Sequence, residues 1–166
     1  RQWRGDARLG ATCRGAGVAN NGHPRFAAAP TPTAGFLPPH LSLPLLDVEN
    51  LLGWHVTASR VKVLWDLYSA PAQVDKADLV VAACSHRFAS RVLFSLPSRV
   101  RVVIGADVHD GADVALLEAV DASLQATRFT RVVVGSGDHA FTPMAQEFVA
   151  AGCPADLVTG IGFTAR

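Results

Sequence analysis

The sequence predicts an α/β fold, a doubly wound parallel sheet of five strands with helices on both faces. Three observations lead to this prediction. Short apolar runs alternate with amphipathic stretches from residue 41 onward, a pattern typical of parallel strands joined by helices. Crossovers between parallel strands are right-handed, which places helices on both faces of the sheet. Hydrophobic residues make up 49% of the 166 residues, which is enough for one substantial core.

Five short apolar runs predict the strands. The runs are residues 43–47, 77–83, 100–105, 131–134 and 156–159. Periodic apolar positions between the first three runs predict two helices. The inward positions are Val61, Leu64, Trp65 and Tyr68 in the first helix, and Phe88, Val92 and Leu96 in the second, which covers residues 87–96.

Two further helices follow the third and fourth strands. One is expected over residues 113–126, and its inward positions are Val114, Leu117, Val120 and Leu124. The other is expected to begin at Thr142 as its cap, with Pro143 in the first helical position. Gly152 and Pro154 are expected to end it.

The charge distribution separates two regions of the chain. Residues 1–40 carry five Arg and one acidic residue, a net charge of +4, and are rich in Gly and Pro. They are expected to form a disordered or linker-like arm, because they offer little apolar surface to bury. Residues 41–166, the expected folded domain, carry ten basic and thirteen acidic residues, a net charge of −3. Simple charge therefore does not mark the domain as a nucleic-acid binder, although cations bound to its carboxylates would let it act on phosphates.

The three cysteines, Cys13, Cys84 and Cys153, are odd in number and form no CxxC motif. This argues against a disulfide framework or a zinc site and favours a reducing compartment, so a cytoplasmic location is expected. No apolar run reaches the roughly 18 residues that a membrane span requires. No membrane partner is therefore expected.

Carboxylates follow three of the predicted strands at the point where each strand ends. Asp47 and Glu49 follow the first strand, Asp110 and Asp113 the third, and Asp138 the fourth. In such folds, ligands bind beyond the carboxyl ends of the strands, so these side chains are expected at one edge of the sheet. Each alone is more typical of a turn or a helix cap. Asp47 fits that role least, because it directly follows an apolar run, where an unpartnered carboxylate is costly.

Carboxylates that are brought together repel one another unless a cation neutralises them. Ligand sets made only of oxygen favour Mg²⁺ or Mn²⁺ over zinc. Because Mg²⁺ keeps several waters and bridges to substrate phosphates, phosphodiester or phosphoryl chemistry is expected.

Three separated motifs carry a family resemblance. They are Leu-Leu-Asp-Val-Glu-Asn-Leu at residues 45–51, Gly-Ala-Asp-Val-Ala-Leu at 111–116 and Val-Val-Gly-Ser-Gly-Asp-His-Ala-Phe-Thr-Pro-Met at 133–144. In order, spacing and element type, they resemble the motifs of NYN domains, a branch of the PIN-like nuclease superfamily. The resemblance covers about residues 41–160.

The resemblance implies a PIN-like domain and a metal-dependent ribonuclease. It implies that Asp47, Asp113 and Asp138 bind Mg²⁺ or Mn²⁺, which would activate a water for in-line attack on an RNA phosphodiester. It also implies that Asn50 helps to hold the site and that Ser136 orients the last loop.

The last motif departs from the family pattern at Ala140, where the family usually has a second Asp. Asp110 or Glu49 would compensate in one interpretation. In the alternative, the domain is a catalytically weakened relative that binds RNA or a protein partner. A third interpretation is a nucleotide-binding module, because residues 135–140 match G-x-G-x-x-A between a strand and a helix. Against it, these glycines follow the fourth strand rather than the first, and too little chain remains for a second nucleotide-binding half.

Four basic residues, Arg60, Lys62, Arg87 and Arg91, lie in the first turns of helices that begin at the acidic edge. They are candidates for gripping RNA phosphates, and ordinary solvated helix surface is the alternative. Trp54 follows the first motif and would either stack on a base or pack down on the domain. The expected partner is single-stranded RNA, and a homo-oligomer or a protein partner is compatible with the sequence.

Overall fold

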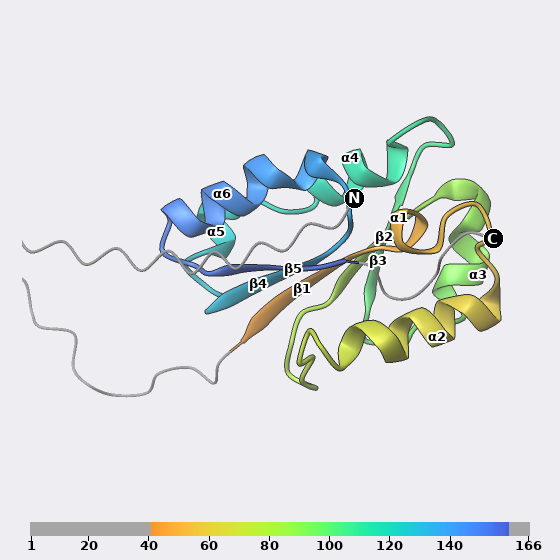
Figure 1. Cartoon of the computed structure of the whole chain (residues 1–166), viewed down its shortest axis with the longest axis horizontal. Coiled ribbons are helices and arrows are strands. Elements are labelled where there is room, and N and C mark those ends of the chain that lie inside the picture. The colour runs from red at the N-terminus through yellow and green to blue at the C-terminus, as the bar shows by residue number, and fades with distance from the viewer. Residues whose placement is uncertain (1–40, 160–166) are drawn as a thin grey trace, which may run out of the picture. The chain divides into compact units, whose positions relative to one another are not determined.

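The computed structural model describes residues 41–159, so the expected arm of residues 1–40 lies outside the described residues. The described part contains a five-stranded parallel sheet with the strand order β3-β2-β1-β4-β5 (Figure 1). The strands are β1 (Ser42–Asp47), β2 (Val81–Ser85), β3 (Arg101–Gly105), β4 (Arg131–Gly135) and β5 (Ala155–Val158). The first described strand, β1, lies at the centre of the sheet, and the later strands add outward on both sides of it, which confirms the predicted doubly wound fold.

Helices cover both faces of the sheet (Figure 1). One face carries α1 (Val48–Leu52), α2 (Ala58–Ser69) and α3 (Ala89–Leu93), and the other carries α4 (Gly111–Glu118), α5 (Ala122–Gln125) and α6 (Thr142–Ala150). Two 3₁₀ helices, η1 (His86–Phe88) and η2 (His139–Phe141), follow β2 and the loop after β4. No helix within residues 41–159 combines the length and the apolar character that crossing a membrane requires.

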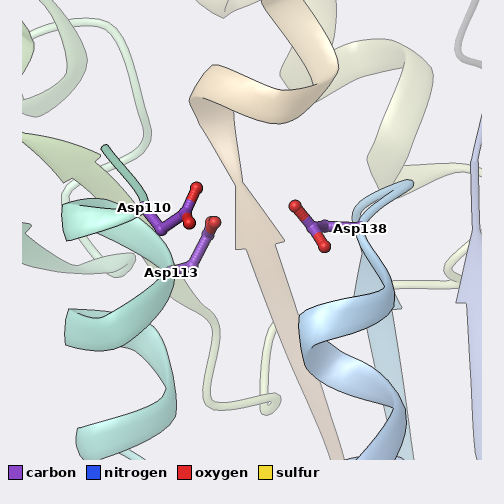
Figure 2. Close-up of side chains that lie close together, drawn as sticks. All are labelled: Asp110, Asp113 and Asp138. Carbon is purple, nitrogen blue, oxygen red and sulfur yellow. The ribbon is translucent and has the colours of Figure 1, made fainter.

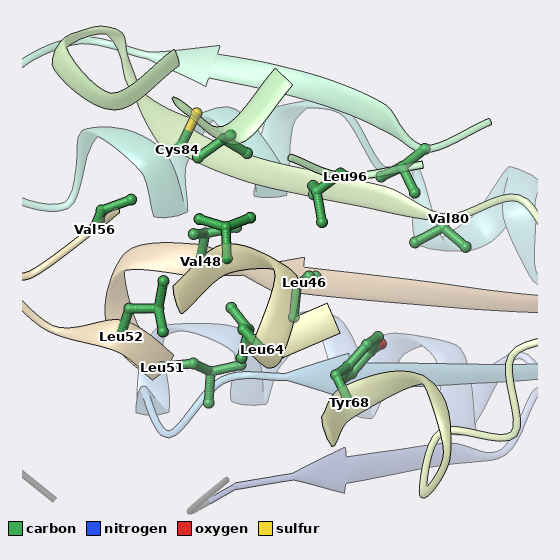
Figure 3. Packing of buried hydrophobic residues seen from close by; sticks show 14 of the residues in the cluster. Leu46, Val48, Leu51, Leu52, Val56, Leu64, Tyr68, Val80, Cys84 and Leu96 are labelled. Atoms are coloured by element: carbon green, nitrogen blue, oxygen red, sulfur yellow. The ribbon is translucent and has the colours of Figure 1, made fainter. Parts of the chain in front are cut away.

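The central strand β1 is buried on both faces because successive side chains point in opposite directions. Leu46 packs with Leu64 and Tyr68 in the core under α2 (Figure 3). Leu45 packs in the second core, under α4 and α6. The Tyr68 hydroxyl donates to the backbone carbonyls of Leu45 at 3.2 Å and Val133 at 3.0 Å. This buried polar atom is therefore satisfied by β1 and β4, and it ties α2 to the middle of the sheet.

The second strand begins later than expected. The apolar run at residues 77–83 predicts a strand from residue 77, but β2 starts at Val81. The cause is Asp78, whose buried carboxylate accepts hydrogen bonds from the backbone N–H groups of Ser42 at 2.8 Å and Asp75 at 2.7 Å. Because these hydrogen bonds hold the chain in a turn, the pairing of β2 with β1 begins only after the turn, at Val81.

The prediction of one helix over residues 113–126 is wrong in extent and in phase. The segment forms α4 and α5, and Asp121 starts the second helix by accepting a hydrogen bond from the Leu124 N–H at 3.0 Å. The predicted inward residues Val114 and Leu124 are 50% and 54% exposed. Of the predicted set, Val120 is buried and Leu117 partly buried. The side chains that pack inward from these two helices and the turn between them include Ala112, Leu116, Val120 and Ala122.

Two more of the four predicted helices also differ from the prediction at their ends. The segment 87–96 begins as η1 and continues as α3 only to Leu93, although Val92 and Leu96 are buried as expected. Thr142 is the first residue of α6 rather than its cap. Asp138 acts as a cap instead, because its Oδ1 accepts from the Ala140 N–H at 2.8 Å and so starts η2.

Two glycines bring the start of α4 against the end of β3. A Cβ on Gly105 would overlap the Gly111 carbonyl oxygen and lie 2.7 Å from the Ala112 nitrogen. A Cβ on Gly111 would overlap the Ala106 carbonyl oxygen. Because the obstructing atoms belong to the backbone, they cannot move aside as a side chain would. Glycine at both positions therefore places α4, which carries Asp113, close to the sheet edge.

We expect Gly105→Ala to lower the free energy of unfolding by at least about 2 kcal/mol, because the added methyl group has no room. Urea denaturation followed by circular dichroism measures the effect. Gly137→Ala is the matched control, since its Cβ would meet only the Asn50 Oδ1 atom, at 3.3 Å. A Gly105→Ala protein as stable as the wild type would contradict the close approach of α4.

Candidate metal centre

Three carboxylates meet at the carboxyl edge of the sheet. Asp138 lies in the loop after β4, Asp110 directly precedes α4 and Asp113 lies in the first turn of that helix. One carboxylate oxygen from each lies within 4.8 Å of the others. Figure 2 shows Asp110 and Asp113 on one side of the end of β1 and Asp138 on the other. The strand topology therefore gathers acids that are far apart in the sequence.

Asp47 ends β1 beside this cluster and is almost completely buried, with 1% of its surface exposed. Its Oδ1 accepts a hydrogen bond from the Asn50 N–H at 3.1 Å, and its Oδ2 accepts one from the Ser136 hydroxyl at 2.9 Å. Burial, and next the negative charge of Asp113, raise the pKa of Asp47 from its ordinary value of 3.8 to about 7. The hydrogen bonds oppose this shift but do not cancel it.

Asp113 is also buried, and burial is the main reason that its pKa is raised. The negative charges of Asp138, Asp110 and Glu49 raise it further, while its interaction with the Asp47 carboxyl lowers it. Asp47 and Asp113 thus form a pair that retains one proton to a higher pH than an ordinary carboxyl group would. Without a cation, the edge of the sheet carries an unfavourable concentration of negative charge near neutral pH.

Hydrogen bonds connect the first and last motifs around this centre. The Ser136 hydroxyl, which donates to Asp47, also accepts from the Asp138 N–H at 3.1 Å. The Asn50 Oδ1 accepts from the Gly137 N–H at 2.7 Å. Asn50 and Ser136 therefore hold the loop after β4 against the end of β1, and this loop carries Asp138.

A cleft of about 360 Å³ lies over the acids. Its lining includes all five predicted acidic residues, Asp47, Glu49, Asp110, Asp113 and Asp138, together with Asn50. Trp54, Arg87, Phe88 and His109 complete much of the remaining wall. The cleft is large enough to admit part of a nucleotide chain, and its floor is acidic.

The four predicted basic residues are not equivalent. Arg87 lines the cleft, and its guanidinium lies 3.4 Å from the Glu49 carboxylate. The other Glu49 oxygen accepts a hydrogen bond from the Ser85 N–H. Arg60, Lys62 and Arg91 lie outside the lining of the cleft, and Arg91 donates to the Val56 carbonyl at 3.4 Å.

Asp110 was expected only to support the site, but its carboxylate groups directly with those of Asp113 and Asp138. The two residues are three positions apart in the sequence, but Asp110 precedes α4 in a left-handed backbone conformation, with a φ of +56°. The geometry of this turn, rather than helical spacing, therefore brings the two carboxylates together. No sequence signal marks His109 and Phe88 as residues that also line the cleft.

The chain was compared with family models, curated proteins and solved structures, and none of them matches it. The resemblance to NYN domains therefore rests on the three motifs.

Proposed function

We propose that this domain is a divalent-cation-dependent ribonuclease that hydrolyses phosphodiester bonds of single-stranded RNA. The observation that carries the proposal concerns buried Asp113. It interacts with Asp47, and one of its carboxylate oxygens lies within 4.8 Å of oxygens of Asp110 and Asp138. Such an arrangement costs free energy at neutral pH. A cation is the usual means of offsetting that cost when only oxygen ligands are present.

The donor set fits Mg²⁺ or Mn²⁺. Mg²⁺ binds oxygen at about 2.0–2.1 Å, so two ligands on opposite sides of it are about 4.2 Å apart. The 4.8 Å limit on the separations among Asp110, Asp113 and Asp138 is close to that span. These three residues would hold the cation. Asp47 would either join them, as the motif resemblance implies, or support Asp113 through the interaction between their carboxyl groups.

The other residues of the site would position the acids and attract the phosphate chain. A bound divalent cation would lower the pKa of a water and neutralise phosphate oxygens. Ser136 and Asn50 hold the loop that presents Asp138. Glu49 orients Arg87 at the wall of the cleft, where a guanidinium attracts the phosphate chain.

A cytoplasmic location is part of this proposal. Within the described residues, Cys84 and Cys153 are both free thiols and both buried. Free thiols suit a reducing compartment such as the cytoplasm.

The test is the incubation of labelled single-stranded RNA with the protein in Mn²⁺, in Mg²⁺ and in EDTA, together with the Asp47→Asn variant. Cleavage that needs the metal and is lost in the variant is the expected result. Cleavage that persists in EDTA or in the variant would place the activity elsewhere.

A second candidate function is the binding of RNA or of a protein partner without cleavage. It is favoured by Ala140, which is exposed in η2 where the family usually has an acid. RNA binding by the folded protein without cleavage in either metal would support this function over hydrolysis.

We expect Ala140→Asp to raise the Mn²⁺ affinity and the cleavage rate by about tenfold, the lower range of effects seen for residues around a metal site. The Ala140 N–H is bonded to Asp138, so the new carboxylate would lie next to a cluster member. Ala140→Asn is the control, because it adds the same volume without the charge. Equal cleavage rates for the Asp and Asn variants would show that the missing charge does not limit activity.

A further inference from the structure

Trp54 stands exposed at the mouth of the acidic cleft. It lies in the loop between α1 and α2, and 84% of its surface is accessible to solvent. The preceding Gly53 has a φ of +64° and ends α1 by donating its N–H to the Glu49 carbonyl at 2.7 Å. A tryptophan left in water adds little to folding, since its large apolar surface remains unburied.

Arg87 contacts the rings of both Trp54 and Phe88. Its guanidinium carbon lies 5.9 Å from the centre of the Trp54 ring and 4.7 Å from that of Phe88. Both distances are in the range of cation–π contacts. Arg91 adds a further contact, 5.8 Å from the Phe88 ring, and its bond to the Val56 carbonyl ties α3 to the loop that carries Trp54. The platform therefore consists of Trp54, Arg87 and Phe88. Glu49 positions Arg87, and Arg91 contacts Phe88 and the loop that carries Trp54.

We propose that this platform binds an unpaired base of a single-stranded nucleic acid, which stacks on Trp54 while Arg87 contacts the adjoining phosphate. The inference deepens the proposed function, on which it rests for the role of the acids, by naming how the strand is recognised. Among the lining residues of the cleft, Arg87 is the one permanent positive charge, and all five acids lie on the same lining. A polyanion entering the cleft therefore meets its attractive contact at the aromatic wall, beside the acids that would hold a cation.

The geometry distinguishes a single strand from a duplex. Stacking on an aromatic side chain needs a free base face, which a single strand offers and an intact duplex covers within its own stack. Base–aromatic stacking also tolerates different bases, because every base has a π face. The platform therefore selects strand state rather than sequence.

The test measures binding by fluorescence anisotropy. The full chain, in a buffer that contains Ca²⁺, is titrated into labelled oligoadenylate, which is either single-stranded or annealed to its complement. We expect Trp54→Ala to weaken binding of the single strand between about fivefold and a hundredfold, and Trp54→Phe to retain part of the affinity. Arg87→Ala should also reduce the magnitude of the slope of log affinity against log salt concentration by about 0.7. The matched control is Phe94→Ala, which removes an equally exposed ring (87%) that does not line the cleft.

Unchanged single-strand affinity in Trp54→Ala, or an equal loss for the duplex or in Phe94→Ala, would overturn the platform. Calorimetry of Mn²⁺ binding to the wild type and to Trp54→Ala tests the metal site independently. It therefore distinguishes a failure of base stacking on Trp54 from a failure of the proposed hydrolysis. Metal-dependent cleavage together with unchanged oligoadenylate affinity in Trp54→Ala would leave the nuclease and remove the platform. Loss of affinity in Trp54→Ala without cleavage by the wild type would leave the platform and remove the nuclease.

Discussion

Replacing Asp113 with Asn is expected to lower metal-dependent RNA cleavage by more than about a hundredfold, because even a change in an outer partner of a metal ligand commonly costs 10- to 100-fold. Asp113 is the central acid of the cluster, since it contacts Asp47 and lies within 4.8 Å of Asp110 and Asp138. Asn keeps its shape and removes its charge. The measurement is the single-turnover cleavage rate of labelled single-stranded RNA as a function of Mn²⁺ concentration.

Asp66→Asn is the control for this experiment, because it removes an exposed carboxylate of α2 that lies outside the cleft. Its cleavage rate should equal that of the wild type. A thermal melt of each variant separates lost chemistry from lost folding. A folded Asp113→Asn protein that cleaves within about twofold of the wild type would remove the acidic cluster from the mechanism.

Asp47→Asn is expected to stabilise the metal-free domain at alkaline pH while removing its activity. The pKa of Asp47 is raised from 3.8 to about 7 by burial and then by the charge of Asp113. A folded-state pKa above the unfolded value contributes stability that is complete below pH 3.8 and is lost as the pH rises through about 7. At pH 8, the wild type has lost this contribution.

Asn carries no ionisable proton and can still accept from the Asn50 N–H and donate to the Ser136 hydroxyl. The stability difference between Asp47→Asn and the wild type should therefore be small at pH 4 and should grow toward pH 8. Urea denaturation in EDTA at the two pH values measures it. Added Mn²⁺ should stabilise the wild type more than the variant, because a ligand that binds only the folded state shifts the equilibrium toward it.

Asp78 supplies the contrasting variant. Its carboxylate is also buried, but it accepts hydrogen bonds from the backbone N–H groups of Ser42 and Asp75, and the cluster around Asp113 does not include it. Asp78→Asn should destabilise the domain, because one of these donors is left opposite an amide N–H. A loss of stability in Asp47→Asn as large as that in Asp78→Asn at pH 8 would show that Asp47 supports the fold rather than straining it.

Much of the fold was predictable because its signals are local. The central strands β1, β2 and β4 lie in apolar runs whose side chains are buried on both faces of the sheet, so the runs themselves mark where these strands lie. The same holds for α2, where Val61, Leu64 and Tyr68 leave one clear inward face. The segment 113–126 has no such clear face, since small and large apolar residues lie all around it. Its phase is set by the close backbone approach of Gly105 and Gly111, which is a tertiary contact.

By itself, the sequence determined that acids follow three parallel strands and that they would meet at one edge of the sheet, because strand position and strand direction follow from local patterning and right-handed crossovers. The tertiary structure alone decided which oxygens meet. It groups Asp110 with Asp113 and Asp138, places Asp47 in the buried layer beside them, and sets Arg87 against Trp54. The physical reason is that these relations depend on turn geometry and on packing between segments distant in sequence, and no local periodicity encodes such distances.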